Sequence, residues 1–315
     1  MSYKEAPLRK IKRVPFASRK NKVRAGMFTS PAVPGRSLAE FTESIPRILA
    51  GNDLKNLCLD LAAASRAGGR VLWLVGAHVI KCGLSRHLIT LMDRGVINHL
   101  ALNGAGAVHD LEIALFGETS EDVAENLENG TFGMARETAQ AYHRAARHAR
   151  KKKIGLGEAL GGSLITAPHA DLSLLAAAFK RNIPATVHVA LGTDIVHQHP
   201  EASGRDLGES SLRDFRILAA SAGSLDHRGG VVNLGSAVIL PEVFLKALAV
   251  ARNLGGRKAA RNFFAANLDF IQAYRSRLNV VARPTGGGKS RAYLLTGHHE
   301  IMVPLLTAWV LEELA

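Results

Sequence analysis

The chain has 315 residues with 47% hydrophobic content, which is enough to bury one large core. Its only two cysteines, Cys58 and Cys82, fit neither a disulfide framework nor a cysteine-based zinc site. No apolar run reaches the roughly eighteen residues of a membrane helix, and the first residues are basic and polar. Composition therefore argues against secretion and membrane spanning, and we expect a cytoplasmic protein.

The formal net charge of +13 is concentrated in two stretches. Residues 4–24 contain nine lysines and arginines against one acid, Glu5, and residues 144–153 contain six more. The second group falls at the C-terminal end of an expected helix, where cations complement the helix dipole. The first stretch has only Tyr3 and Phe16 as stacking groups, so we expect no specific nucleic-acid binding. We divide the chain into a basic N-terminal arm, residues 1–36, and one domain, residues 37–315.

The domain begins with a helical pattern over residues 38–66, which Pro46 interrupts and a cap at Asn52 and Asp53 restarts. Short apolar runs and helical patterns then alternate along the chain. The expected strands are 71–75, 96–102, 186–191, 230–234 and 267–271, and the expected helices are 84–94, 109–116, one opened by Ser120, 132–153, 212–221, 241–254 and one at the C-terminus. This alternation predicts an α/β fold with a doubly wound, mainly parallel, Rossmann-like sheet.

Small, glycine-rich turns follow four of the expected strands. In an open parallel sheet, ligands bind beyond the carboxyl ends of the strands, where helix N-termini present free N–H groups. Glycine lets the backbone approach a diphosphate or a ribose closely, although each turn alone is equally well explained as a tight connection. The four segments are Gly76-Ala77-His78 with Lys81-Cys82-Gly83, Asn103-Gly104-Ala105-Gly106-Ala107, Gly192-Thr193-Asp194 and Gly235-Ser236-Ala237. Together they predict one nucleotide-binding crevice.

Five segments, in their order and approximate spacing, resemble deoxyhypusine synthases. They are residues 76–83, 103–112, 192–194, 232–238 and 300–306. The resemblance covers the chain from about residue 70 to the C-terminus. It implies a Rossmann-like sheet that binds NAD, an enzyme that removes a hydride from spermidine, and a lysine that carries the aminobutyl group as an imine. It also implies a homo-oligomer, typically a tetramer, with active sites between subunits.

The resemblance also implies roles for single residues. The turn that starts at Asn103 matches the family's glycine-rich contact to NAD, and Asp194 matches an acidic position near the cofactor. Lys289 falls near the family's nucleophilic lysine, and a desolvated lysine has suitable chemistry. The full candidate set is Lys289, His298 and Glu300 for catalysis, Asn103, Gly104, Ala105, Gly106, Asp194, Gly235 and Ser236 for the cofactor, and His78, Asp110, Glu112, His197 and Glu242 for the substrate, with no metal ligand.

The sequence departs from the family in ways that bear on the substrate. The tryptophan before the lysine is missing, and Arg275 and Arg277 occupy the loop in which the family has acids that hold a polyamine. Arginines would repel a buried cationic substrate, whereas they pair well with carboxylate or phosphate. We therefore expect an anionic or neutral substrate rather than spermidine.

A group of histidines suggests a different chemistry. A His-x-His pair and a His-His-Glu run near the ends of expected strands could bind zinc or supply a general base. The group consists of His188, His197, His199, His298, His299 and Glu300. It supports a rival hypothesis, a metal-dependent lyase or hydrolase that uses zinc.

The leading hypothesis is an NAD-binding, deoxyhypusine-synthase-like enzyme with transferase or oxidoreductase chemistry on a carbon–nitrogen substrate. We expect a homo-oligomer, either dimer or tetramer, that binds a small-molecule substrate and no membrane. A second rival is a non-enzymatic, basic oligomeric protein that binds RNA or another partner through its arm.

Overall fold

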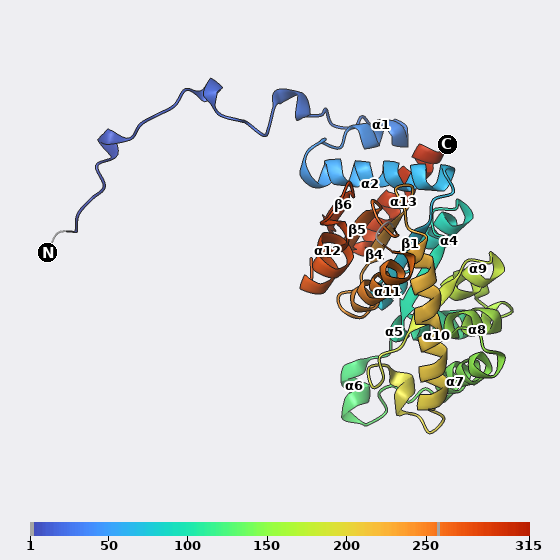
Figure 1. The fold of residues 1–315 in the computed structure, drawn as a ribbon. Helices are drawn as coiled ribbons and strands as arrows, with labels where there is room; N and C mark the ends of the chain where they lie inside the picture. Colours follow the sequence, from blue (N-terminus) through green and yellow to red (C-terminus); the bar gives the residue numbers. More distant parts are fainter. Residues whose placement is uncertain (1–2, 257–258) are drawn as a thin grey trace.

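One six-stranded sheet forms the centre of the chain, of which the computed structural model describes residues 3–256 and 259–315 (Figure 1). The strands are β1 Val71–Val75, β2 His99–Asn103, β3 Ala185–His188, β4 Gly230–Leu234, β5 Phe264–Asp269 and β6 Ala292–Thr296. Their order across the sheet is β3-β2-β1-β4-β5-β6, and every neighbouring pair is parallel. The expected doubly wound, parallel, Rossmann-like sheet is therefore confirmed.

Helices cover both faces of this sheet. They are α1 Leu38–Glu43, α2 Leu49–Arg66, α3 Ala77–Lys81, α4 Ser85–Asp93, α5 Gly104–Phe116, α6 Val123–Glu128, α7 Arg136–Lys152, α8 Leu156–Leu164, α9 Leu174–Lys180, α10 Gly204–Gly223, α11 Ile239–Gly255, α12 Arg283–Thr285 and α13 His299–Leu314, with a π-helical segment at Ser276–Ala282. Helices α2, α4, α5, α8, α9 and α13 contribute to the core on one face, whereas α11, the π-helical segment and most of α10 contribute to the core on the other.

The burial of β1 explains why its sequence predicted it correctly. Val71, Trp73 and Val75 belong to the core on one face, and Leu72 and Leu74 belong to the core on the other. A strand covered on both faces needs a continuous apolar run, because successive side chains point to opposite sides. Strand β6 was not expected, since it lies at the edge of the sheet and its residues alternate between exposed and buried.

Two expected helix starts are wrong. Pro46 does interrupt the first helical pattern, but α2 already begins at Leu49, so that Asn52 and Asp53 lie inside the helix and cap nothing. Ser120 does not open α6, because the carboxylate that accepts the backbone N–H of Glu125, at 3.1 Å, belongs to Asp122. An N-cap is the residue whose side chain reaches the second or third N–H of the helix, and composition alone did not distinguish these neighbours.

Five of the six strands were expected, but their boundaries were predicted less accurately. Strand β2 starts three residues later than expected, and β5 covers residues 264–269 instead of 267–271. As a result Asp269, expected inside a strand, is the residue with which β5 ends. Helices α8 and α9 were not expected at all, because their alanine- and glycine-rich sequences show little helical periodicity.

Residues 3–36 precede this body as an extended segment that leads away from it in Figure 1. The segment contains only short 3₁₀ turns, at Leu8–Lys10, Phe16–Ser18 and Ala25–Met27. Residues 1 and 2 of the predicted arm lie outside the described residues, and its role as a separate unit stays a prediction. None of the helices in the described part of the chain is long and apolar enough to span a bilayer.

A buried carboxylate, Asp214, joins two elements next to the candidate site. It lies on α10 with no exposed surface, and its Oδ2 accepts the N–H of Gly157 at 2.9 Å and that of Val187 at 2.8 Å. These bonds fix the first turn of α8 against β3. Burial raises the pKa of Asp214 to about 7, although the backbone hydrogen bonds lower it.

Replacing Asp214 by asparagine should remove this titration. Because the pKa is raised in the folded state, the folded chain holds the proton more tightly than the unfolded chain, and wild-type stability falls as pH rises from about 4 to about 7. Relative to Asp214→Asn, we expect the wild type to lose about 3–4 kcal/mol over this range in urea unfolding. A free-energy difference between the two proteins that stays constant across these pH values would contradict this account.

Candidate functional site

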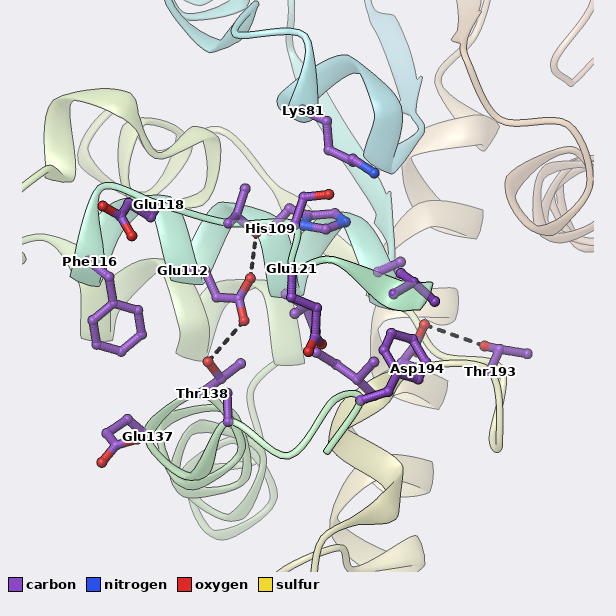
Figure 2. A pocket seen from close by; sticks show the side chains of 18 residues that line it. Lys81, His109, Glu112, Phe116, Glu118, Glu121, Glu137, Thr138, Thr193 and Asp194 are labelled. Atoms are coloured by element: carbon purple, nitrogen blue, oxygen red, sulfur yellow. Dashed lines mark hydrogen bonds between the residues drawn. The ribbon is translucent and has the colours of Figure 1, made fainter. Parts of the chain in front are cut away.

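A cavity of about 780 Å³ lies beyond the carboxyl ends of β2 and β3 (Figure 2). Its inner wall consists of α5, the last residue of α3 and the turn after β3. Its outer wall is the segment between Phe116 and Thr138, which includes the start of α6 and the start of α7. Because ligands of open parallel sheets bind at this edge, we treat the cavity as the candidate functional site.

The chain itself caps the amino end of α5. Asn103 ends β2 and its side chain accepts the N–H of Gly106 at 3.0 Å. The carboxylate of Asp194, from the turn after β3, lies in front of the helix, close enough to the N–H of Ala105 for this group to lower the pKa of Asp194. A Cβ on Gly104 would come within 1.8 Å of Asp194 Oδ2, so only glycine allows this contact. Five residues expected to contact a cofactor are therefore together, but they contact one another.

Asp194 lines the inner wall of the cavity, and His197 lies next to it. Asp194 is 8% exposed, and burial raises its pKa to about 6 although hydrogen bonds from Thr193 and Ala105 lower it. His197 Nε2 lies 3.8 Å from Asp194 Oδ2. Burial, and then the neighbouring His143, lower the pKa of His197, which is therefore neutral at physiological pH. His197, which was expected to bind the substrate, does not line the cavity, and its role stays a prediction.

Two side chains of α5, His109 and Glu112, face the cavity and form hydrogen bonds with its outer wall. Thr138 donates to Glu112 Oε1 at 2.9 Å, and Thr119 donates to Glu112 Oε2. The hydroxyl hydrogen of Thr119 is directed at Glu112. The Nδ1 of His109, 2.7 Å from the Thr119 hydroxyl oxygen, must therefore donate a hydrogen bond to that hydroxyl oxygen. This fixes the tautomer and leaves Nε2 as an acceptor. Burial, and then Lys81, lower the pKa of His109 to about 4, so its ring is neutral.

The charge of the cavity wall is predominantly negative. Figure 2 shows Lys81 at the top of the view above His109, with the acidic side chains below Lys81 and Glu112 among them. The five carboxylates are Glu112, Glu118, Glu121, Glu137 and Asp194, and Lys81 is the one lysine or arginine among the lining residues that the structure describes. Val108, Phe116 and Phe132 supply apolar surface. Such a wall suits a ligand with an apolar stem and a cationic nitrogen, because a desolvated cation needs carboxylate partners.

Gly235 and Ser236, expected at the cofactor, lie outside this cavity at the switch point between β1 and β4. A Cβ on Gly76 would come within 2.0 Å of the Gly235 carbonyl oxygen, so the two turns touch. The Ser236 hydroxyl accepts the N–H of Leu240 at 3.3 Å in the first turn of α11. Packing and capping account for these residues, and their cofactor role stays a prediction.

Asp110 is a structural residue, which corrects its expected place at the substrate. It is fully buried on the side of α5 that faces α9. Its carboxylate accepts the Ser173 hydroxyl and the N–H of Leu174, both at 2.6 Å, and the N–H of Leu175 at 3.1 Å. The side chain therefore caps α9. Glu112, two residues further along α5, does line the cavity.

Arg275 and Arg277, from which an anionic or neutral substrate was expected, do not lie at the cavity. Arg275 forms an ion pair with Glu242, which also pairs with Lys246, and Arg277 is exposed. None of these residues lines the cavity. The expectation of Glu242 as a substrate ligand is therefore not supported either, since its carboxylate is already paired with two cations.

Within one chain, Lys289 lies at the edge of the sheet opposite to the cavity. It is exposed in the connection that precedes β6, and its N–H donates to Asn262 Oδ1 at 3.2 Å, in the connection that precedes β5. Both connections lie at the amino ends of strands, whereas the cavity lies at the carboxyl ends. A role in the cavity would need a second copy of the chain to supply this lysine.

The histidines that were expected close together lie at the two opposite ends of the carboxyl edge of the sheet. His188 and His197 belong to the end of β3, and His298 and His299 follow β6, and these are the two outer strands of the sheet. His199 instead contacts the carbonyl of Gly133 at 2.8 Å. Among residues 3–256 and 259–315, no group of three or more histidine, cysteine or acidic side chains is placed to hold a metal ion. The zinc-dependent rival is therefore not supported.

The amino end of α5 fits the ribose of NAD but not its diphosphate. Asp194 Oδ2 is buried and has no hydrogen-bond partner among the described residues, so it can accept from a ribose hydroxyl. The same carboxylate occupies the position in front of the helix at which a phosphate would bind.

Sequence reasoning missed the outer wall of the site. Thr119 and Thr138 come from this wall, whose position no sequence pattern indicated. Lys81 was expected at the crevice, but only as part of a turn and without a role of its own. Asp269, which lies outside the cavity, was hidden by the wrong boundaries of β5.

The fold is shared with proteins of known structure. The ternary complex of AgrE with ornithine and NAD⁺ superposes with a TM-score of 0.53 at 15% identity, over 84% of this chain and 34% of that chain. A protein described as LOR/SDH from Methanococcus maripaludis gives 0.53 at 14% identity, over 85% and 70%. A protein described as a deoxyhypusine synthase from Entamoeba histolytica gives 0.51 at 12% identity, over 87% and 93%.

The chain spans about a third of the length of AgrE. No protein-family model and no curated protein sequence matches it. At these identities the similarities establish a common fold, and the sheet of this chain is therefore of the type found in the protein described as a deoxyhypusine synthase and in AgrE, whose complex contains NAD⁺.

Proposed function

We propose that the chain is an NAD-dependent enzyme that acts on a small molecule with a cationic nitrogen, and that this nitrogen binds in the cavity beside α5. The observation that carries the proposal is the wall of five carboxylates against one lysine around a space of about 780 Å³. A space of this size accommodates a metabolite-sized ligand. Burying a cation there costs little only because carboxylates replace its water.

The comparisons support this class of ligand. One structural neighbour is a complex with ornithine and NAD⁺, and ornithine carries two amino groups on an apolar stem. The carboxylates of Glu112 and Asp194 lie along α5, the deepest wall, whereas Glu118, Glu121 and Glu137 are exposed nearer its mouth. A cationic group is therefore attracted at the mouth and held at the inner wall.

The residues of α5 hold the ligand and keep it oriented. The neutral ring of His109 offers Nε2 as a hydrogen-bond acceptor, because Thr119 and Glu112 fix its other nitrogen as a donor. Asp194 Oδ2 would accept from a ribose hydroxyl of the cofactor. When bound, NAD would supply a hydride acceptor for oxidation at the carbon next to the nitrogen.

We expect wild-type protein to bind L-ornithine at least about 10-fold more tightly than L-norvaline, which has the same stem without the terminal amine, in isothermal titration calorimetry. Glu112→Gln should weaken ornithine binding by about 10-fold, or ~1.4 kcal/mol, since one charge-assisted contact is lost. Glu128→Gln, on α6 but outside the cavity wall, is the matched control and should bind like the wild type. Equal affinity for the two ligands would refute the cationic site.

NAD⁺ should raise the thermal unfolding midpoint, because a ligand that binds only the folded chain stabilises it. NADP⁺ should not, since its 2′-phosphate would meet the carboxylate of Asp194. Asp194→Asn should reduce the shift that NAD⁺ causes. Equal shifts with both dinucleotides would contradict the contact between Asp194 and the ribose, and no shift with either would remove NAD from the proposal.

A further inference from the structure

A second group of titratable side chains lies at the same edge of the sheet, outside the cavity. Asp269 ends β5, His299 begins α13 directly after β6, and His78 belongs to α3 after β1. His299 Nε2 is 3.6 Å from Asp269 Oδ1. The rings of His78, Phe270 and His299 are mutually adjacent, with centroids 5.8–5.9 Å apart. Three strands that are distant in sequence thus bring one buried acid–base pair to the ligand-binding edge.

His299 has unused hydrogen-bonding capacity. Its side chain is 1% exposed, yet neither ring nitrogen makes a well-formed hydrogen bond to any described residue. Gly235, with a positive φ of 69°, packs against this ring, and a Cβ there would come within 2.8 Å of His299 Cε1. A buried imidazole whose nitrogens lack well-formed hydrogen bonds is costly, so such a residue at a ligand-binding edge points to a ligand that supplies the missing bond.

Helix α3 connects this group with the cavity. Val79 and Ile80 are buried, whereas His78 and Lys81 are exposed. Residues three apart lie on one face of a helix, so His78 and Lys81 share the exposed face of α3. Lys81 lines the cavity, and His78 contacts His299. A ligand that extends from the cavity across this face would reach His78 within one turn.

We propose that Asp269 and His299 form the acid–base pair for the far end of the ligand, which passes over α3 and His78 and presents a hydroxyl or an amine to His299. The groups that face this end, Asp269, neutral His299 and the nearby Glu300, are hydrogen-bond acceptors, so a donor fits. The proposal rests on the proposed function, because the cavity must hold the other end of the ligand.

The step is a proton transfer alone. The O–H or N–H bond of the ligand breaks, its electron pair stays on oxygen or nitrogen, and the proton ends on a ring nitrogen of His299. The carboxylate of Asp269 then compensates the positive ring, as an acid that orients a histidine does in hydrolytic enzymes. His78 contacts the ligand, and Asp269 acts as a positioning residue.

The protonation states agree with this step. Burial lowers the pKa of His299, and His78 lowers it further, whereas Asp269, the Leu268 carbonyl and Glu300 raise it. Burial raises the pKa of Asp269, while His299 and His78 lower it. The ring of His299 is therefore neutral before the ligand arrives and can accept a proton.

The pair can be tested without any ligand by following the Cε1–H resonance of His299 through a pH titration by NMR. Asp269→Asn should move the titration midpoint of His299 to lower pH, because the charge that favours the imidazolium is removed. Asp226→Asn, which changes an exposed acid paired with Arg228 before β4, is the matched control and should leave the midpoint unchanged. An unchanged midpoint in Asp269→Asn would overturn the pair.

The ligand path is tested in the same spectra with L-ornithine as the probe, and with resonances assigned through His78→Gln and His299→Gln. L-ornithine should shift both the His78 and the His299 resonance, and L-norvaline should shift neither. If calorimetry detects ornithine binding while both resonances stay in place, this inference is refuted and the cavity proposal stands. If no ornithine binds, both proposals are refuted.

Discussion

The parallel direction of all six strands is the constraint on which the site depends. A parallel sheet needs a crossover between each pair of strands, and these crossovers cover both faces with helices. All strand carboxyl ends then meet at one edge, and the turns after β1, β2 and β3 bring Lys81, Ala105 and Asp194 to a single cavity. The apolar runs that allow burial on both faces therefore also determine where polar chemistry is possible.

Within that edge, the chain uses its own carboxylate at the amino end of α5. In dinucleotide-binding folds a phosphate commonly occupies such a position. Here Asp194 faces the N–H of Ala105 and lies so close to Gly104 that a side chain at that position cannot fit. The first turn of the helix therefore favours hydroxyl and ammonium donors over anions. A resemblance in the pattern of glycines can thus accompany a different ligand preference.

The sequence was sufficient for the fold and for part of the site. Strands β1 and β4 were predicted to the residue, because they are buried on both faces, while β6 at the edge was not predicted. Asp194 was placed correctly because it follows a strand. Asp110 and Glu112 could not be distinguished, since two residues on a helix differ by roughly 200° in direction and only packing shows which one faces α9.

The error for Lys289 has a related cause. Glycine-rich turns occur at both ends of strands, and without knowing that β6 begins at Ala292, a loop before a strand resembled a loop after one. The histidines show the same limit, because their sequence gives their distance along the chain but not that β3 and β6 are the two outermost strands.

The outer wall of the cavity has a consequence for how this protein can change. The stretch between Phe116 and Thr138 contributes no strand and no residue to the two large cores. Glu121 accepts the N–H of Gly133 within this stretch, and Thr119 and His199 connect the stretch to the rest of the chain. Loops of this kind tolerate replacement better than the elements beneath them. The contacts that this stretch would make with the proposed ligand are therefore separable from the folding of the sheet, and the stretch can be exchanged while the sheet keeps its stability.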